Sequence, residues 1–251
     1  MSERADLEEI LQTALALGVQ VHRAGGYTAR TDILMKRVAL ALGADKADPA
    51  ITATLVGLTV TKNEWSRTAF RSAVFAGVNF SELTELSRLA KDCEGKTAVE
   101  VRAELDTIKA TSKRYGLSVV IPAVGVGSAS LAALFGADPA GMLITGLAGA
   151  VGALLRAWLM QRHFKPFVFS LFGAFLSVAI VMVLRGYTST LEPALAASVL
   201  YLVPGVPLLN GTADLLTGYY LNGIARLTMS SVVFVGASIG LLIALTLWGF
   251  T

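Results

Sequence analysis

The stretch "YLVPGVPLLNGTADLL" (residues 201–216) decides how this chain is built, because it interrupts an apolar segment with helix-breaking residues. Pro204, Gly205 and Pro207 stand within four residues, and a lone carboxylate, Asp214, follows them. Each proline lacks the backbone N–H and so removes a hydrogen bond from a helix. Backbone groups left free in lipid are costly, and such a break is tolerated only where it is buried in protein or lines a wet cavity. The stretch therefore predicts a broken membrane helix.

Charge is distributed unevenly along the 251 residues, of which 54% are hydrophobic. Residues 1–116 contain 16 of the 21 Lys and Arg and 15 of the 18 Asp and Glu, so the rest of the chain has only 8 charged side chains. This division implies water as the solvent of the first part and lipid as the solvent of the second. We expect a soluble domain over 1–116 and a membrane domain over 117–251. No basic stripe interleaved with aromatic residues is present, so nucleic acid is not expected as a partner.

Five apolar spans are predicted in the membrane domain, each with about the 17–25 residues needed to cross a hydrocarbon core. They are 117–135, 140–160, 166–184, 193–209 and 228–250. The flanks on the side of the soluble domain carry five basic residues, Lys113, Arg114, Arg162, Lys165 and Arg226. The opposite flanks carry only Arg185. The positive-inside rule therefore predicts a cytoplasmic N-terminal domain and an outside C-terminus.

The soluble domain is predicted to be a small α+β domain. Hydrophobic residues at helical spacing predict four helices, over about 5–22, 30–42, 80–94 and 97–113. Ser81 and Thr97 are the candidate N-caps of the last two helices. Two segments rich in Thr, Val and Phe, 51–61 and 67–75, predict a β-hairpin around "KNEWS". The predicted fold class is an α-helical membrane protein with five transmembrane helices, one broken at Pro-Gly, and an N-terminal cytoplasmic α+β domain.

The broken span is the first candidate for a functional site. If this span enters from outside near Pro193, Pro204 lies 11 residues further on. That distance is about 17 Å, or roughly half of the hydrocarbon core. Transporters coordinate substrates with the unwound carbonyls and half-helix ends of such breaks. Pro207 suits the first turn of a new half-helix, whose N–H groups would favour an anion. We therefore expect Pro204, Gly205 and Pro207 at a translocation site.

Polar and small residues continue beyond the break at every fourth position. They are Asn210, Asp214, Gly218, Asn222 and Arg226, and they predict one ridge on a single helix. One interpretation is the solvent-facing side of a helix at the membrane surface. The other is that Asn210 and Asp214 face a transport pathway, since burying an unpaired carboxylate near the membrane interior is costly and such a residue is a candidate for function.

Arg156, late in the second span, has two interpretations as well. It could provide the counter-charge of Asp214 or bind the anionic group of a substrate. Alternatively, it snorkels to the inner membrane surface a few residues away. The sequence leaves both interpretations open.

Motifs for catalysis and for metal binding are missing from the sequence. There is no Walker loop, nucleophile elbow or paired-carboxylate motif. Cys93 is the single cysteine, and His22 and His163 lack the spacing of metal ligands. We therefore expect no catalytic residue, no metal and no cofactor. The stretch "HRAGGYTARTD" (22–32) is unusual, and is either a solvated helix–helix turn or a contact with a ligand or partner.

Three stretches together resemble the threonine/serine exporter family. They are "GGYTARTDILMKRVALALG" (25–43), "AGVNFSELTELSRL" (76–89) and "LVPGVPLLNGTADLLTGYYLNGIARL" (202–227). The resemblance implies an exporter in a bacterial inner membrane, with a cytoplasmic domain before the membrane helices. The family pattern carries over to eight positions here, Pro204, Gly205, Pro207, Asn210, Asp214 and Arg226 near the break and Gly26 and Arg30 in the soluble domain.

The resemblance also implies partners. A chain of five spans is similar to the larger component of a split, two-component form, which is linked to the export of succinate-like dicarboxylates. We therefore expect a smaller membrane component, or a second copy of this chain, as the partner within the lipid bilayer. Threonine or serine export is the alternative function. A membrane-anchored hydrolase, with His22 and a serine or Cys93 as a weak offer of base and nucleophile, and a sensor or scaffold are further alternatives.

Overall fold

The computed structural model describes residues 3–75 and 77–249. Contacts between residues group the chain into two compact units. The N-terminal unit consists of 1–114 together with 206–227, and the apolar unit consists of 115–205 together with 228–251. The segment 206–227 thus packs with residues that precede the first span, which the sequence did not indicate.

Four helices of the N-terminal unit lie where the hydrophobic spacing predicts them. They are α1 (Glu3–Arg23), α2 (Thr28–Ala41), α3 (Phe80–Lys91) and α4 (Ala98–Thr111). Thr97 caps α4 in a capping box with Glu100, as its position suggests. The prediction of Ser81 as an N-cap is wrong. Helix α3 begins at Phe80, and the side chain of the N-cap residue Asn79 accepts the hydrogen bond from the backbone N–H of Glu82.

The N-terminal unit has an antiparallel sheet in the order β1-β2-β3, one strand more than the predicted hairpin. The strands are β1 (Lys46–Ile51), β2 (Leu55–Lys62) and β3 (Trp65–Ser72). The missed strand, β1, contains Asp48, Pro49 and two alanines, which are poor strand formers. Because β1 is an edge strand, its proline needs no partner for the missing N–H.

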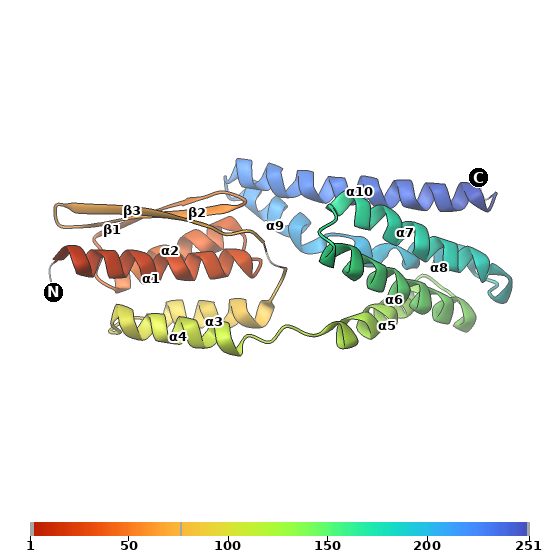
Figure 1. The fold of residues 1–251 in the computed structure, drawn as a ribbon, viewed down its shortest axis with the longest axis horizontal. Coiled ribbons are helices and arrows are strands. Elements are labelled where there is room, and N and C mark those ends of the chain that lie inside the picture. Colours follow the sequence, from red (N-terminus) through yellow and green to blue (C-terminus); the bar gives the residue numbers. More distant parts are fainter. Residues whose placement is uncertain (1–2, 76, 250–251) are drawn as a thin grey trace. The chain divides into compact units, whose positions relative to one another are not determined.

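This unit is built in three layers (Figure 1), with α1 and α2 between the sheet and the pair α3 and α4. On β2, Val56, Leu58 and Val60 alternate with residues of the outer face and are buried in the main core. Leu11 and Leu15 of α1 belong to the same core. The core therefore holds α1 along most of its length and fixes the position of the loop that follows it.

The apolar unit contains most of the candidate membrane spans. Its helices are α5 (Leu117–Leu134), α6 (Pro139–Gln161), α7 (Pro166–Val183) and α8 (Leu191–Ser198), with 3-10 turns at Arg185–Tyr187 and Leu200–Leu202. Together with α10 (Tyr220–Leu247), α5, α6 and α7 are long and apolar enough to cross a membrane. A fifth span results if Leu191–Leu202 and α9 (Gly205–Leu216) count as one broken helix. The described residues thus provide four spans, or five with this pair.

The predicted break at the Pro-Gly motif is confirmed. The two halves of the broken helix meet at an angle of 64°. Val203 is not helical, with φ −60° and ψ 121°, as expected for a residue that precedes a proline. Helix α9 begins at Gly205, so Pro207 lies in its first turn, where a backbone N–H has no helical partner in any case. Pro204 therefore separates the two halves, and Pro207 is compatible with the second half.

The single polar ridge predicted behind the break is wrong. Helix α9 ends at Leu216 and α10 begins at Tyr220, so the polar residues lie on two helices. Gly218 between them has a φ of +87°, a left-handed conformation that glycine adopts easily. The N–H of Tyr219 bonds the carbonyl of Asp214 at 2.8 Å and closes the turn. A repeat of four residues cannot distinguish a continuous helix from two helices joined by such a turn.

Candidate functional site

Asp214 lies fully buried in the N-terminal unit, at the beginning of α2. Its Oδ1 accepts a hydrogen bond from the backbone N–H of Thr28 at 2.7 Å, and its Oδ2 accepts one from the Thr28 hydroxyl at 3.0 Å. Thr28 is the first residue of α2, and the N-cap residue Tyr27 provides no side-chain cap. Asp214 therefore caps α2 from a different helix and places a negative group at the positive end of the helix dipole.

Arg226 is the counter-charge that the structure gives to Asp214. Its Nε lies 3.1 Å from Asp214 Oδ2, and its Nη2 donates to the carbonyl of Gly26 at 3.2 Å. The sequence suggested Arg156 as one option for this pairing, but the observed ion pair is between α9 and the first turns of α10. Removing one partner of such a buried pair is strongly destabilising, because the other charge remains buried.

Two asparagines complete the contacts around the loop between α1 and α2. Asn210 Nδ2 donates to the carbonyl of Gly25 at 2.8 Å. Asn222 Nδ2 donates to the Thr28 hydroxyl at 3.0 Å and to the carbonyl of Ile51 at 2.9 Å. Four of the five residues of the predicted ridge therefore bind the same short part of the N-terminal unit. The interpretation of the ridge as a solvent-facing surface is wrong for Asp214 and Asn222, which are both buried.

His22, at the end of α1, is buried next to this group. Its Nε2 lies 3.1 Å from the carbonyl of Ala53, to which the neutral ring can donate, and its Nδ1 has no hydrogen-bond partner among the described residues. Burial lowers the pKa of His22 from its ordinary value, and the positive charge of Arg226 adds to this effect. The Ala53 carbonyl and Asp214 oppose it. His22 is therefore a neutral, structural histidine at neutral pH.

The second group of polar residues lies in the apolar unit, around Arg156 of α6. The guanidinium carbon is 5.4 Å from the ring centre of Phe169 in α7, which is within the range of a cation–π contact. The Nε of Arg156 is buried and has no hydrogen-bond partner within the described residues. A cation inside an apolar helix bundle is expensive and is a candidate for function.

Two hydroxyl groups accompany Arg156. The hydroxyl of Tyr201 is 3.2 Å from Ser177 Oγ, and Ser177 in turn donates to the carbonyl of Ala148 at 3.1 Å. A side chain at Gly152 would overlap both hydroxyl groups, so the glycine makes room for them against α6. Since Arg156 is one helical turn beyond Gly152, it lies on the same side of α6 as this glycine.

The Arg156 cluster, defined as Arg156, Ser177 and Tyr201, has the chemistry of an anion site. A guanidinium offers five N–H donors in a planar fork that matches a carboxylate. The two hydroxyl groups donate within the protein, Ser177 to Ala148 and Tyr201 to Ser177, so the guanidinium is the donor that an anion would meet. Tyr201 precedes Pro204 by three residues and lies in the 3-10 turn Leu200–Leu202, directly before the break. The cluster therefore lies beside the broken helix and inside one unit.

The remaining predicted site residues have separate positions. Arg30 Nη2 donates to Ser87 Oγ at 2.7 Å and joins α2 to α3, so it is not part of the Asp214 network. Pro204 is half-buried, and Gly205 is exposed with open space where a side chain would lie. Arg30 therefore bonds to α3 rather than to the buried carboxylate.

Three residues of these groups were not predicted from the sequence, Thr28, Ser177 and Tyr201. A threonine directly after "GGY" and a tyrosine directly before "LVPG" are weak signals that could have drawn attention to two of them. Ser177 has no such signal, because serines are common in apolar helices where they bond to backbone carbonyls.

The chain is similar to known transport proteins along nearly its whole length. The family model described as "Putative threonine/serine exporter" (ThrE) matches residues 12–248. A relative from Escherichia coli (strain K12), named "Probable succinate transporter subunit YjjP", is 29% identical over 243 residues, which are 96% of this chain and 95% of the relative. A relative of the same name from Klebsiella aerogenes is 27% identical over 251 residues, 99% of this chain and 97% of the relative. No solved structure matches the chain.

Proposed function

The chain belongs to the threonine/serine exporter family, and from this premise we propose that it is the larger subunit of an exporter for a small carboxylate. A succinate-like dicarboxylate is the proposed substrate. The names of the two relatives support this class of molecule, and both name a transporter subunit. Membership of a transporter family also favours transport over a membrane-anchored hydrolase or a sensor.

One observation carries the choice of substrate, namely the charge of the Arg156 cluster. Arg156, Ser177 and Tyr201 together provide one positive charge and two hydroxyl groups among apolar helices. The guanidinium in this set binds a carboxylate well, because charge-assisted hydrogen bonds are strong where water is excluded. The neighbouring break at Pro204 and Gly205 interrupts a helix, as do the breaks at which transporters coordinate their substrates.

Threonine or serine export is the second candidate, because the family description names these amino acids. A zwitterion needs a negative partner for its ammonium group as well as a positive partner for its carboxylate. The Arg156 cluster consists of one cation and two neutral hydroxyl groups. It therefore fits a carboxylate better than a zwitterion.

The proposed location is the bacterial inner membrane, with several crossings. The N-terminal domain, residues 1–116, is placed in the cytoplasm and the C-terminus outside. The excess of Lys and Arg in the flanks on the side of the N-terminal domain supports this orientation. Helix α10 has 28 residues, or about 42 Å, whereas a hydrocarbon core of about 30 Å takes up about 20 residues. Its first turns are therefore free to extend into the N-terminal unit, as observed.

The proposed partner is a smaller membrane component that completes the transport path. Substrate sites of many transporters lie between two repeated halves. This chain has one helix pair bent at a break within the described residues, which is one side of such an arrangement. The word "subunit" in the names of the relatives supports a partner of this kind.

The experiment that tests the proposed function is efflux from cells that lack their own exporters, measured for succinate and for threonine. We expect Arg156→Gln to reduce succinate efflux by about 10- to 100-fold at low substrate concentration, which corresponds to the loss of one charged hydrogen-bond donor. Arg156→Lys should retain part of the efflux, because it keeps the charge without the fork. The matched control is Arg162→Gln, an exposed arginine after the last turn of α6, which should transport like the wild type.

Two results would contradict the proposal. If Arg156→Gln and Arg156→Lys both transport succinate at the wild-type rate, Arg156 only snorkels to the surface. If threonine rather than succinate leaves the cells, the amino-acid alternative is correct.

A further inference from the structure

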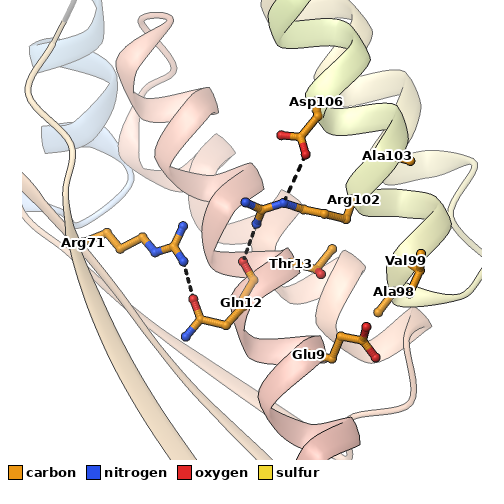
Figure 2. A pocket seen from close by; sticks show the side chains of 9 residues that line it. All are labelled: Glu9, Gln12, Thr13, Arg71, Ala98, Val99, Arg102, Ala103 and Asp106. Atoms are coloured by element: carbon orange, nitrogen blue, oxygen red, sulfur yellow. Dashed lines mark hydrogen bonds and ion pairs between the residues drawn. The ribbon is translucent and has the colours of Figure 1, made fainter.

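A cavity of about 500 Å³ lies in the N-terminal unit between α1, β3 and α4 (Figure 2). This volume is in the usual range of sites for small molecules. Charged side chains of both signs line the cavity, with Arg71 and Arg102 as the cations and Glu9 and Asp106 as the carboxylates. The transport function proposed above does not use any of these residues.

Gln12 holds the two arginines of the cavity in place. Arg71 Nη2 donates to the side-chain oxygen of Gln12, and Arg102 Nη1 donates to its backbone carbonyl at 3.4 Å. The Gln12 amide in turn donates to Glu8 at 2.8 Å, and Arg102 Nε lies 3.6 Å from Asp106. Figure 2 shows both guanidinium groups converging on Gln12. Because each guanidinium has five N–H donors, most of them remain available to a ligand.

Glu9 supplies a negative charge in the cavity. It directly follows Glu8, which accepts the hydrogen bond of the Gln12 amide. Within residues 3–75 and 77–249, the Glu9 carboxylate has no ion-pair or hydrogen-bond partner. The hydroxyl group of Thr13, one helical turn further along α1, adds a donor and an acceptor. Ala98 and Val99, in the first turn of α4, provide an apolar wall. The cavity thus offers cations, a free carboxylate, a hydroxyl group and an apolar surface.

We propose that this cavity binds a small α-amino acid as a zwitterion. The carboxylate of the ligand contacts Arg71 and Arg102, and its ammonium group contacts Glu9. The two cations and the two carboxylates of the cavity balance, so a neutral zwitterion meets no net repulsion. A dicarboxylate would bring its second carboxylate towards Glu9 or Asp106, and like charges at this distance repel. The site is thus distinct in charge from the Arg156 cluster, which is purely cationic.

The test is isothermal titration calorimetry with the full chain in detergent and L-alanine as the probe. It is run on the Arg156→Gln variant as well as the wild type, so that a signal from the transport path is separated from one in this cavity. We expect saturable binding of L-alanine in both proteins. N-acetyl-L-alanine lacks the ammonium group, L-alaninamide lacks the carboxylate and succinate carries two carboxylates. Each of these three should bind at least about tenfold more weakly than L-alanine.

Substitutions in the cavity locate the binding. Arg71→Gln and Glu9→Gln should each weaken L-alanine binding by at least about tenfold, whereas Arg71→Lys should have an intermediate effect. The matched control is Arg67→Gln, an exposed arginine four residues away on the same face of β3, which should bind like the wild type. Thermal unfolding of each variant checks that it is folded. If Arg71→Gln is not folded, the single variants Glu9→Gln and Arg71→Lys test the binding site instead.

Three results would overturn the proposal. The first is a wild-type chain that shows no binding of L-alanine up to about 10 mM, where a site of even weak affinity would fill. The second is succinate binding more tightly than L-alanine. The third is unchanged affinity in both Arg71→Gln and Glu9→Gln. None of these results affects the proposed transport function, which depends on Arg156.

Discussion

The buried carboxylate of Asp214 has three partners, since the N–H and hydroxyl of Thr28 donate hydrogen bonds to it and the guanidinium of Arg226 forms an ion pair with it. Burial of a charged group without such partners would be costly. The sequence predicts Asn210, Asp214 and Arg226 at a translocation site, and that role stays a prediction. Their contacts also give them a structural role at the beginning of α2, which can be tested separately from transport.

We expect Asp214→Asn to reduce the free energy of unfolding by about 3–5 kcal/mol, because Arg226 stays buried without this counter-charge. Denaturation of the detergent-solubilised chain measures this change. The double variant with Arg226→Gln should lose less than the sum of the two single variants, since both charges are then removed. Glu85→Gln, in an exposed ion pair with Arg88, is the control and should change stability by less than about 1 kcal/mol. Additive losses would show that the pair contributes nothing.

The buried His22 leads to a prediction about how the stability of the chain depends on pH. Because burial lowers its pKa in the folded chain, the unfolded chain binds more protons between the folded pKa and about 6.5. Stability therefore rises with pH in this window and falls as the pH drops below about 6.5. Thermal unfolding between about pH 8 and 5 should show this decrease, and His22→Gln should make it shallower.

His163→Asn is the control for this pH series. His163 lies in the exposed turn between α6 and α7 with a φ of +60°, and asparagine tolerates that conformation. Its pH profile should keep the wild-type slope. Equal slopes for wild type and His22→Gln would show that His22 does not cause the decrease.

At the scale of elements, the broken helix combines two local rules. Pro204 forces Val203 into an extended conformation and ends the first half, while Pro207 fits the first turn of α9. The two prolines therefore have unequal effects on the 64° bend, although they are only three residues apart.

We expect Pro204→Ala combined with Pro207→Ala to leave the chain in the membrane but to abolish efflux of the substrate. A continuous helix would satisfy the backbone groups that the site needs. Pro207→Ala alone should have little effect, because the N–H that alanine adds has no helical partner in the first turn. Pro122→Ala, in the unbroken helix α5, is the matched control and should transport normally. Wild-type efflux by a well-expressed double variant would disprove the role of the break.

At the scale of the whole molecule, the chain passes from the apolar unit into the N-terminal unit at residue 206 and back again after residue 227. Residues 206–227 contain the buried ion pair and both asparagines that bond to the loop between α1 and α2. A change in this segment therefore affects the stability of the N-terminal unit.

The partner can be tested with sealed vesicles of known composition. We expect succinate flux in vesicles that contain this chain and the smaller component, and little flux with either one alone, because each supplies one side of the substrate path. Flux by this chain alone as a dimer would identify a second copy as the partner. Full transport by the purified chain, shown to be monomeric in the membrane, would exclude both arrangements.

Local properties of the sequence determined the membrane character, the approximate limits of the first three spans and the break at Pro204. The last span begins at Tyr220, eight residues before its predicted beginning, because the turn at Gly218 starts α10 inside the N-terminal unit. Hydropathy and the missing N–H of proline act over a few residues and do not depend on distant contacts. The same applies to the four helices of the N-terminal unit. Arg156 could be recognised as a candidate because a charge is rare inside an apolar span.

Only the tertiary structure decided which residues meet across the sequence. Asp214 and Thr28 are 186 positions apart, and no local pattern indicates that one caps the helix of the other. The turn at Gly218 and the strand β1 also depend on their surroundings, since the four-residue repeat and the weak strand propensity of β1 favour other structures. The partners of buried polar groups are chosen by proximity in the folded chain, because each such group must find a hydrogen bond there.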